Sequence, residues 1–399
     1  MRKQLLLSLG ILTFLAIATI MVILYGEGYR FGFGSGHPEI LGTGLLVTTS
    51  IPDGAEVFVN GHLTTATNNT INLFPGTYTI KIVKDGYFTW QKTMKVQKEV
   101  VAKADATLFP TAPQLQSLTQ TGVVSPVIDP SMTKVAYTVA SQSAKKNGIY
   151  VFDLGNRALL GLGGAITQIT DETTNILFSN ASLSWSPDGK NILATIPATP
   201  THPAAVYLLD ATGFNSTPSD VTETLATVTT SWDKISTDLH KSQIATLKKP
   251  LGTFADNNWK ILAWSEDDTK ILYTATTSAT IPQIIKPALV GTDSTPEIRS
   301  LTPGATYVYD TKEDKNFKII SASDTAPQLN WYADSKHLIY VHDKKIDVME
   351  YDGQNQTTVY AGPFSEPFVF PSPSGSGIVV LTDLNNPQIL PNLYSIAFR

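Results

Sequence analysis

The sequence predicts an all-β protein that follows a single N-terminal helix. Three observations lead to this expectation: an uncharged apolar run at residues 5–25, alternating apolar and polar residues over 44–109, and a hairpin motif that recurs over 115–399. Because chains beyond about 250–300 residues usually divide, the 399 residues should hold several units. We expect a cytoplasmic stub and transmembrane anchor at 1–30, a linker at 31–43, a β-sandwich at 44–109 and a β-propeller at 115–399.

Composition excludes several functional classes. The chain has no cysteine, so disulfides, thiolate metal sites and a cysteine nucleophile are excluded. Its net charge of −5 does not provide the basic surface that nucleic-acid binding requires. A hydrophobic content of 42% is typical of a folded protein rather than a disordered one.

Residues 5–25 are long enough to cross a membrane, since 21 helical residues span about 31 Å. A cleaved signal peptide is the alternative, because Ala16-Ile17-Ala18 resembles a cleavage site. The chain remains apolar over 19–25, which favours an uncleaved anchor. A buried soluble helix is a third option, disfavoured by the missing polar face. Arg2 and Lys3 place the N-terminus in the cytoplasm and the bulk of the chain outside it.

Residues 44–109 show the period of β-strands. Ala55, Val57 and Val59 alternate with Glu56 and Phe58, which predicts one buried and one outer face. Turn-forming residues separate such strands: an Asn-Gly pair favours a tight hairpin, and Pro-Gly favours a type II turn with a left-handed glycine. The turn positions are Pro52, Gly54, Asn60, Gly61, Pro75, Gly76 and Gly86. We expect an antiparallel sandwich of six or seven strands.

Three blocks of this segment resemble the PEGA domain of surface-attached bacterial and archaeal proteins. They are Ser-Ile-Pro-Asp-Gly-Ala-Glu-Val-Phe-Val-Asn-Gly at 50–61, Leu-Phe-Pro-Gly-Thr-Tyr at 73–78 and Lys-Asp-Gly-Tyr at 84–87. The resemblance implies a non-catalytic extracytoplasmic module, in which the glycines and prolines have structural roles in turns.

The remaining chain repeats a hairpin motif with a tryptophan before its turn. The clearest copy is Leu-Ser-Trp-Ser-Pro-Asp-Gly-Lys at 183–190, and others contain Trp264 and Trp331. Degenerate copies lie at 128–137 and 370–379. Ser-Pro-Asp-Gly suits a type I turn, and Trp185, Trp264 and Trp331 are large enough to fill the space between sheets. Five copies are visible, and blades of about 40–45 residues predict a propeller of five or six blades.

This motif resembles the TolB-type and WD-like propeller repeat, which implies an interaction platform. The order of anchor, sandwich and propeller resembles uncharacterised membrane-anchored PEGA–propeller proteins of bacteria. One insertion, at about 232–248, has helical periodicity and should end at Pro250. We expect this helix to pack on the propeller flank, with partner binding as the alternative. A stretch rich in threonine and proline, 276–302, is expected to be an exposed loop.

Motifs for catalysis and cofactors are absent. The sequence lacks a nucleophile elbow, a phosphate loop, a dinucleotide fingerprint and a zinc helix. His337 and His342 lie five residues apart, which is poor spacing for metal ligands on one strand. Asp188 and the Asp267-Asp268 pair occupy turn positions of the repeat, so solvated turns are favoured over calcium loops. We therefore nominate no catalytic, cofactor or metal residue.

The sequence thus favours a non-catalytic, membrane-anchored binding or scaffold protein. Its partner would be a protein or a cell-envelope glycan, bound at the rim or the central funnel of the propeller. The alternative is a hydrolase of envelope polymers that uses carboxylates in that funnel. A signal-sensing ectodomain is a weaker third option, since only four residues precede the apolar run.

Overall fold

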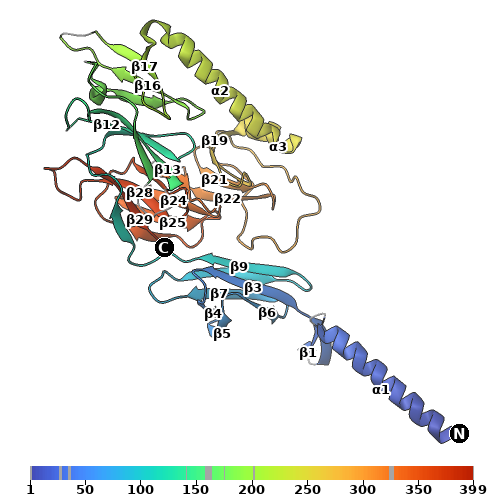
Figure 1. Cartoon of the computed structure of the whole chain (residues 1–399). Helices are drawn as coiled ribbons and strands as arrows, with labels where there is room; N and C mark the ends of the chain where they lie inside the picture. The colour runs from blue at the N-terminus through green and yellow to red at the C-terminus, as the bar shows by residue number, and fades with distance from the viewer. Residues whose placement is uncertain are drawn as a thin grey trace. The chain divides into compact units, whose positions relative to one another are not determined.

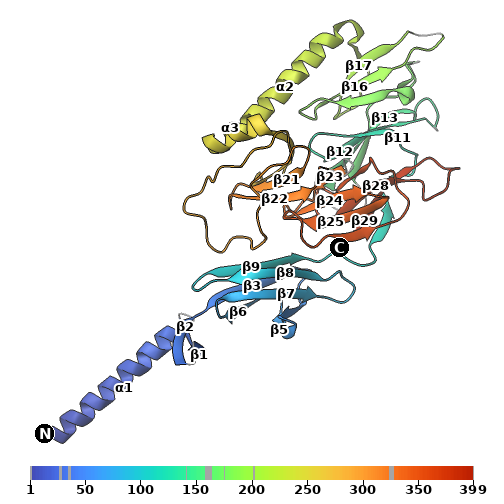
Figure 2. The same cartoon turned by 180° about the vertical axis from the view of Figure 1, so that it is seen from behind.

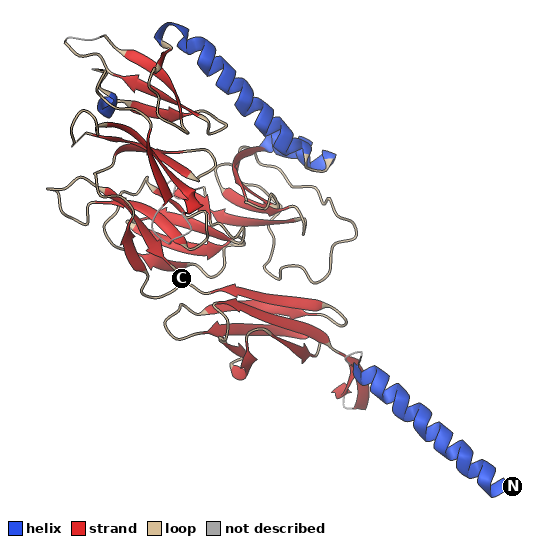
Figure 3. Ribbon diagram, in the orientation of Figure 1, coloured by secondary structure: helices blue, strands red, loops and turns tan. Residues whose placement is uncertain are grey.

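The computed structural model describes residues 2–26, 29–34, 37–140, 142–157, 164–174, 176–200, 203–322 and 328–398. The chain divides into two compact units. The first contains Met1–Thr111 and Ile285–Pro296, and the second contains Ala112–Ile284 and Glu297–Arg399. Strands dominate both units, and the two long helices lie at the N-terminus and in the helical insertion (Figure 3). The all-β prediction is confirmed.

The N-terminal helix α1 (Arg2–Gly26) is apolar over Leu7–Gly26, where its mean hydropathy is 2.6. It is long enough to cross a membrane, as an anchor or a signal sequence would be. The expected linker at 31–43 instead contains most of a two-stranded sheet, β1 (Tyr29–Gly34) with β2 (His37–Gly42). Aromatic residues alternate with glycine in β1, and aromatic residues favour strand backbone.

Seven strands and two sheets form the body of the first unit. The strands are β3 (Gly44–Ile51), β4 (Glu56–Val59), β5 (His62–Ala66), β6 (Asn69–Leu73), β7 (Gly76–Val83), β8 (Trp90–Val96) and β9 (Val101–Thr107). The sheet orders are β6-β3-β9 and β5-β4-β7-β8. Ala55, Val57 and Val59 are buried in the core between the sheets, as their alternation predicted. The expectation of a wholly antiparallel sandwich was wrong, since β3 and β9 pair in parallel after the chain crosses between the sheets.

The segment Ile285–Pro296, here called the strap, belongs to the first unit although its neighbours in sequence belong to the second. Its Asp293 forms an ion pair of 2.9 Å with Lys92 on β8. The Ser294 hydroxyl accepts a hydrogen bond from the Lys95 backbone amide at 3.0 Å. Gly291, with φ of +71°, lies so close to Val100 that an added Cβ would be 2.6 Å from its side chain. The stretch 276–302 is irregular, as expected, and residues 286–291 are exposed, whereas residues 292–295 are half-buried.

Five four-stranded antiparallel sheets make up the second unit, and we call them blades 1 to 5. Blade 1 is β11 (Val124–Ile128), β12 (Lys134–Val139), β13 (Gly148–Arg157) and β14 (Gly164–Gln168); blade 2 is β15 (Ser182–Trp185), β16 (Asn191–Ile196), β17 (Ala205–Asp210) and β18 (Ser219–Asp220). Blade 3 is β19 (Trp259–Trp264), β20 (Lys270–Ala275), β21 (Thr306–Asp310) and β22 (Lys315–Ile320); blade 4 is β23 (Gln328–Trp331), β24 (His337–His342), β25 (Lys345–Glu350) and β26 (Thr357–Tyr360). Blade 5 combines β27 (Val369–Pro371), β28 (Gly377–Thr382) and β29 (Asn392–Ala397) with β10 (Gln114–Ser117) from the start of the unit. This arrangement is a β-propeller with its last blade completed by the first strand.

Buried apolar clusters join neighbouring blades. One cluster joins blades 1 and 2 around Trp185, a second joins blades 1 and 5 around Phe152, and a third joins blades 3 and 4 around Trp331. Blades 4 and 5 meet where the Asn330 side-chain amide donates to the Val369 carbonyl at 2.9 Å. Each blade thus buries its faces against neighbours, as repeat units must.

The helical insertion lies between blades 2 and 3 in the chain and in space. Helix α2 (Leu225–Ala245) follows the short turn η2 (Thr222–Thr224) and runs from blade 2 to the side of blade 3 (Figures 1 and 2). Its first turns pack on blade 2 through Leu225, Val228 and Trp232. Helix α3 (Lys249–Asn258) packs on blade 3 through Leu251 and Ala255. The helix expected at about 232–248 ends at Ala245, before Pro250, and Pro250 lies in the first turn of α3, a position that suits proline.

Candidate functional site

The five repeat turns share one backbone geometry. In each, the amide of the fourth residue donates to the carbonyl of the first, at 2.9–3.2 Å. The fourth residue also has a positive φ in every blade: Met132 (56°), Gly189 (65°), Asp268 (54°), Ser335 (58°) and Gly375 (61°). The four-residue turn expected at Ser-Pro-Asp-Gly therefore recurs where the sequence motif has degenerated, with the same hydrogen bond and the same positive φ.

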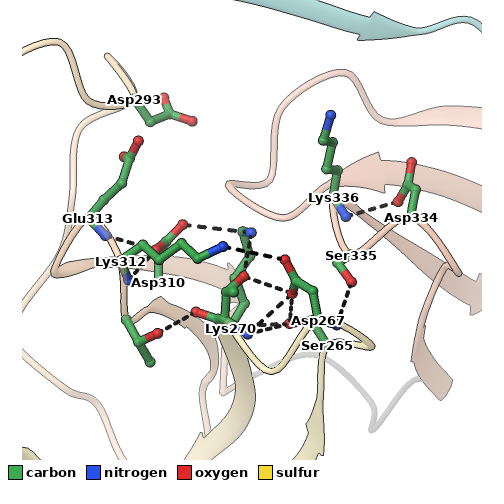
Figure 4. Close-up of polar contacts among 12 residues, drawn as sticks. Ser265, Asp267, Lys270, Asp293, Asp310, Lys312, Glu313, Asp334, Ser335 and Lys336 are labelled. Carbon is green, nitrogen blue, oxygen red and sulfur yellow. Dashed lines mark hydrogen bonds and ion pairs between the residues drawn. The ribbon is translucent and has the colours of Figure 1, made fainter. Parts of the chain in front are cut away.

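Side-chain oxygens close the same turns. In blade 3 the Ser265 hydroxyl accepts from the backbone amides of Thr269 and Lys270, and it donates to Asp267 at 2.8 Å (Figure 4). The Asp267 amide donates to the Ser335 hydroxyl of blade 4 at 3.1 Å. This polar network fixes the turn tips of adjacent blades.

The turn carboxylates are held in their ionised form. Burial alone raises the pKa of Asp267, but hydrogen bonds from Ser265 and Thr269 outweigh it and lower the pKa to about 2. The hydrogen bond from Ser186 lowers the pKa of Asp188. Asp188 and Asp267 are turn-capping groups, and no group of three His, Asp or Glu residues suited to a metal ion occurs within the described part of the chain.

The histidines singled out by spacing do not converge. His337 on β24 is buried, and its Nδ1 lies 2.7 Å from Asp334. His342 lies at the other end of β24, with its Nε2 3.0 Å from Asp347. Each histidine therefore has a carboxylate partner of its own.

Two of the three repeat tryptophans link blades by a hydrogen bond. The Trp185 indole donates to the Val127 carbonyl of blade 1 at 3.0 Å. The Trp331 indole donates to the Ala263 carbonyl of blade 3 at 3.4 Å. Trp264 lies at the equivalent position of blade 3 and lines a cavity.

The turn residues nominated in the sandwich lie in connections between its strands. Gly54, Asn60, Gly61 and Gly86 have positive φ angles of 68°, 50°, 83° and 81°, and Pro52 follows a cis peptide bond. The Asn60 side chain accepts a hydrogen bond from the Thr79 amide at 2.9 Å. The turn expected at Pro75 and Gly76 differs. Gly76 does not have a positive φ. It is already the first residue of β7, where it pairs with Val96.

A cavity of about 540 Å³ lies where the turns of blades 1, 3, 4 and 5 meet. Aromatic and proline side chains form much of its wall: Pro130, Trp264, Trp331, Tyr332, Pro371 and Pro373. His240 and Gln243 of α2 cover one side, and Leu262 of β19 is 45% exposed within it. Glu266 and Asp268 are the acidic residues in its lining. Such a concave, mainly apolar surface is suited to binding.

Sequence reasoning named Trp264, Trp331 and Asp268 as structural residues of the repeat and did not assign them to a binding site. Their convergence depends on the placement of blades more than 200 residues apart in sequence. Partner binding by the helix at 232–248 was the alternative interpretation, but His240 and Gln243 are ordinary polar residues of a helix and do not predict that they line a cavity.

A comparison with protein families identifies the domain in the first unit. The model of the PEGA domain matches residues 43–112, so the chain contains a PEGA domain. A comparison with curated proteins finds no match.

Solved structures similar to the chain include propeller proteins. A putative TolB from Agrobacterium tumefaciens is 13% identical over 69% of this chain and 73% of its own, with a TM-score of 0.23. TolB from Acinetobacter baumannii is 15% identical over 80% of this chain, with a TM-score of 0.23, and the chain spans only 59% of that protein. An acylaminoacyl peptidase from Pyrococcus horikoshii is 14% identical over 67% of this chain and 36% of its own, with a TM-score of 0.18.

Proposed function

We propose that this PEGA-domain protein is a non-catalytic binding or scaffold protein, held in a membrane by α1 with its two β units outside the cytoplasm. Its propeller presents a binding surface to a protein or cell-envelope glycan partner. The observation that carries the proposal is the cavity beside α2, where Leu262 is 45% exposed and Trp264 is half-buried, in front of the buried Trp331 and Tyr332. A concave surface that offers apolar groups beside a few polar ones is suited to binding.

The anchor rests on the length and composition of α1. The described side chains of Leu7–Gly26 lie on the surface of the chain, with none buried inside it. Exposed Leu, Ile, Phe and Val on all sides of a helix are unfavourable in water and favourable in lipid. The two basic residues before the apolar run favour a cytoplasmic N-terminus.

Catalysis by carboxylates has less support than binding. A general acid at neutral pH needs a raised pKa, whereas the pKa of Asp267, which stands in the turn between the cavity residues Glu266 and Asp268, is lowered by hydrogen bonds from Ser265 and Thr269. The cavity wall is formed chiefly by apolar groups, Ser and Thr, with Glu266 and Asp268 as its carboxylates. The hydrolase hypothesis therefore ranks second.

The test is a photo-reactive amino acid introduced at Leu262, inside the cavity, in the full-length protein in living cells. The same amino acid at Phe214, which is 53% exposed and outside the cavity lining, is the control. A single reproducible adduct formed from position 262 and not from 214 supports the proposal. Equal labelling at both positions, or none at 262, contradicts it.

A further inference from the structure

Two pairs of adjacent blades share one hydrogen-bonding rule. Trp185 and Trp331 each occupy the position before the turn, and each indole donates to a carbonyl in the preceding blade of the chain. Val127 and Ala263, the two acceptors, occupy the same position of the repeat, two residues before the turn-closing amides of Asp129 and Ser265. The acceptor that this rule assigns to Trp264 is the Ser184 carbonyl of blade 2.

Trp264 does not follow the rule. Its indole Nε1 is buried and has no hydrogen-bond partner among the described residues. Blades 2 and 3 each pack on the helical insertion, and α2 runs between them (Figure 2). The insertion thus packs on both blades, and the Trp264 indole has no contact equivalent to those of Trp185 and Trp331. A buried donor left unpaired is unfavourable, because it has lost its hydrogen bond to water without gaining another.

The C-terminal half of α2 is loosely packed over this position. A second cavity, of about 560 Å³, lies beside the first, and both are lined by Gln243, Trp264 and Asp268. None of the α2 side chains is fully buried. On the other wall, β19 has an irregular register between Ile261 and Ala263, and Leu262 is exposed there.

Resting on the function proposed above, we propose that the partner is an extended polypeptide that enters between α2 and β19. This polypeptide lies alongside β19 and offers a backbone carbonyl to the Trp264 indole. The class of ligand follows from the repeat itself, since the two equivalent indoles both bind backbone carbonyls of an extended strand. Because the Trp264 Nε1 is buried, binding requires a local opening, and we assign it to the C-terminal half of α2, whose Gln243 lines both cavities with Trp264 and which has no fully buried side chain.

The probe is a synthetic peptide that copies residues 180–187, the inner strand of blade 2, which contains the missing acceptor. Full-length protein in detergent is labelled with 5-fluorotryptophan, and the Trp264→Phe variant assigns the Trp264 fluorine resonance. We expect a saturable shift of this resonance at peptide concentrations up to about 1 mM, with those of Trp185 and Trp331 unchanged. Leu262→Arg should abolish the shift, and Phe214→Arg should leave it intact.

Three results would overturn this inference: no shift of the Trp264 resonance, an equal shift with a scrambled peptide, or a shift caused instead by soluble cell-wall glycan fragments. The proposed function is tested separately by the adduct at position 262. An adduct without the peptide-induced shift rejects the polypeptide strand and retains the binding function, whereas loss of both rejects the two together.

Discussion

Lys92 and Asp293, which are 201 positions apart in the chain, form an ion pair of 2.9 Å whose side chains are only 10% and 7% exposed. Asp293 lies in the strap, and Lys92 lies on β8 of the PEGA domain. Burial alone raises the pKa of Asp293, but the Lys92 charge outweighs it and lowers the pKa. The strap is therefore held by a charged contact as well as by the packing of Gly291 against Val100.

Replacing Asp293 by Asn should destabilise the first unit. Removing one charge of a buried pair costs about 3–5 kcal/mol, because the other charge stays desolvated. Urea unfolding of the full-length protein in detergent measures the loss, and hydrogen exchange should show faster exchange over residues 285–296. The control is Glu99→Gln, at an exposed pair with Lys98, which should leave the midpoint unchanged. An Asp293→Asn variant as stable as the parent would refute this role of the pair.

The three repeat tryptophans should respond differently to replacement by phenylalanine. Trp185→Phe and Trp331→Phe each remove an inter-blade hydrogen bond, worth about 1 kcal/mol beyond the lost packing. Trp264→Phe removes a donor that has no described partner, so it should cost less than either. Chemical unfolding of the three variants side by side gives the comparison. An equal loss for Trp264→Phe would mean that its indole has a partner in solution.

His337 should make stability depend on pH. Burial alone lowers the pKa of His337, but the charge and hydrogen bond of Asp334 outweigh it, so the folded pKa lies above the usual 6.5. The contribution of the charged histidine is therefore complete below about pH 6.5 and is lost as pH rises through the raised pKa. The His337→Asn variant carries the residue that blade 2 has at the equivalent position, Asn191. Its loss of stability relative to the parent should be largest at pH 6 and smallest at pH 9. Thermal melts of both proteins across this range test the sign.

The positive φ at the fourth position of the blade 2 turn favours glycine at residue 189. Its φ is +65°, and an added Cβ would lie 3.3 Å from the Asp129 carboxylate. Gly189→Ala should therefore destabilise the protein by about 1–2 kcal/mol. Gly213→Ala is the matched control, because that glycine lacks a positive φ and has open space around it. Equal unfolding midpoints for the two variants would contradict the assigned turn geometry.

The sequence predicted those features that depend on local pattern. The alternation of Ala55, Val57 and Val59 identified the buried face of the PEGA domain, and Ser-Pro-Asp-Gly identified the repeat turn, since both patterns act over a few residues. The strap was not predicted, because Asp293 lies in an irregular polar stretch and its partner is fixed only by the tertiary fold. The binding cavity and the exceptional Trp264 were likewise hidden, because they follow from where α2 lies among the blades.

The most direct test of the account is protease treatment of intact cells, followed by mass spectrometry of the membrane fraction. The account predicts that peptides from residues 43–398 disappear on treatment, whereas the apolar segment 5–25 stays in the membrane with its N-terminus intact. Protection of residues 43–398 from the protease, or their recovery from the medium without the apolar segment, would contradict it.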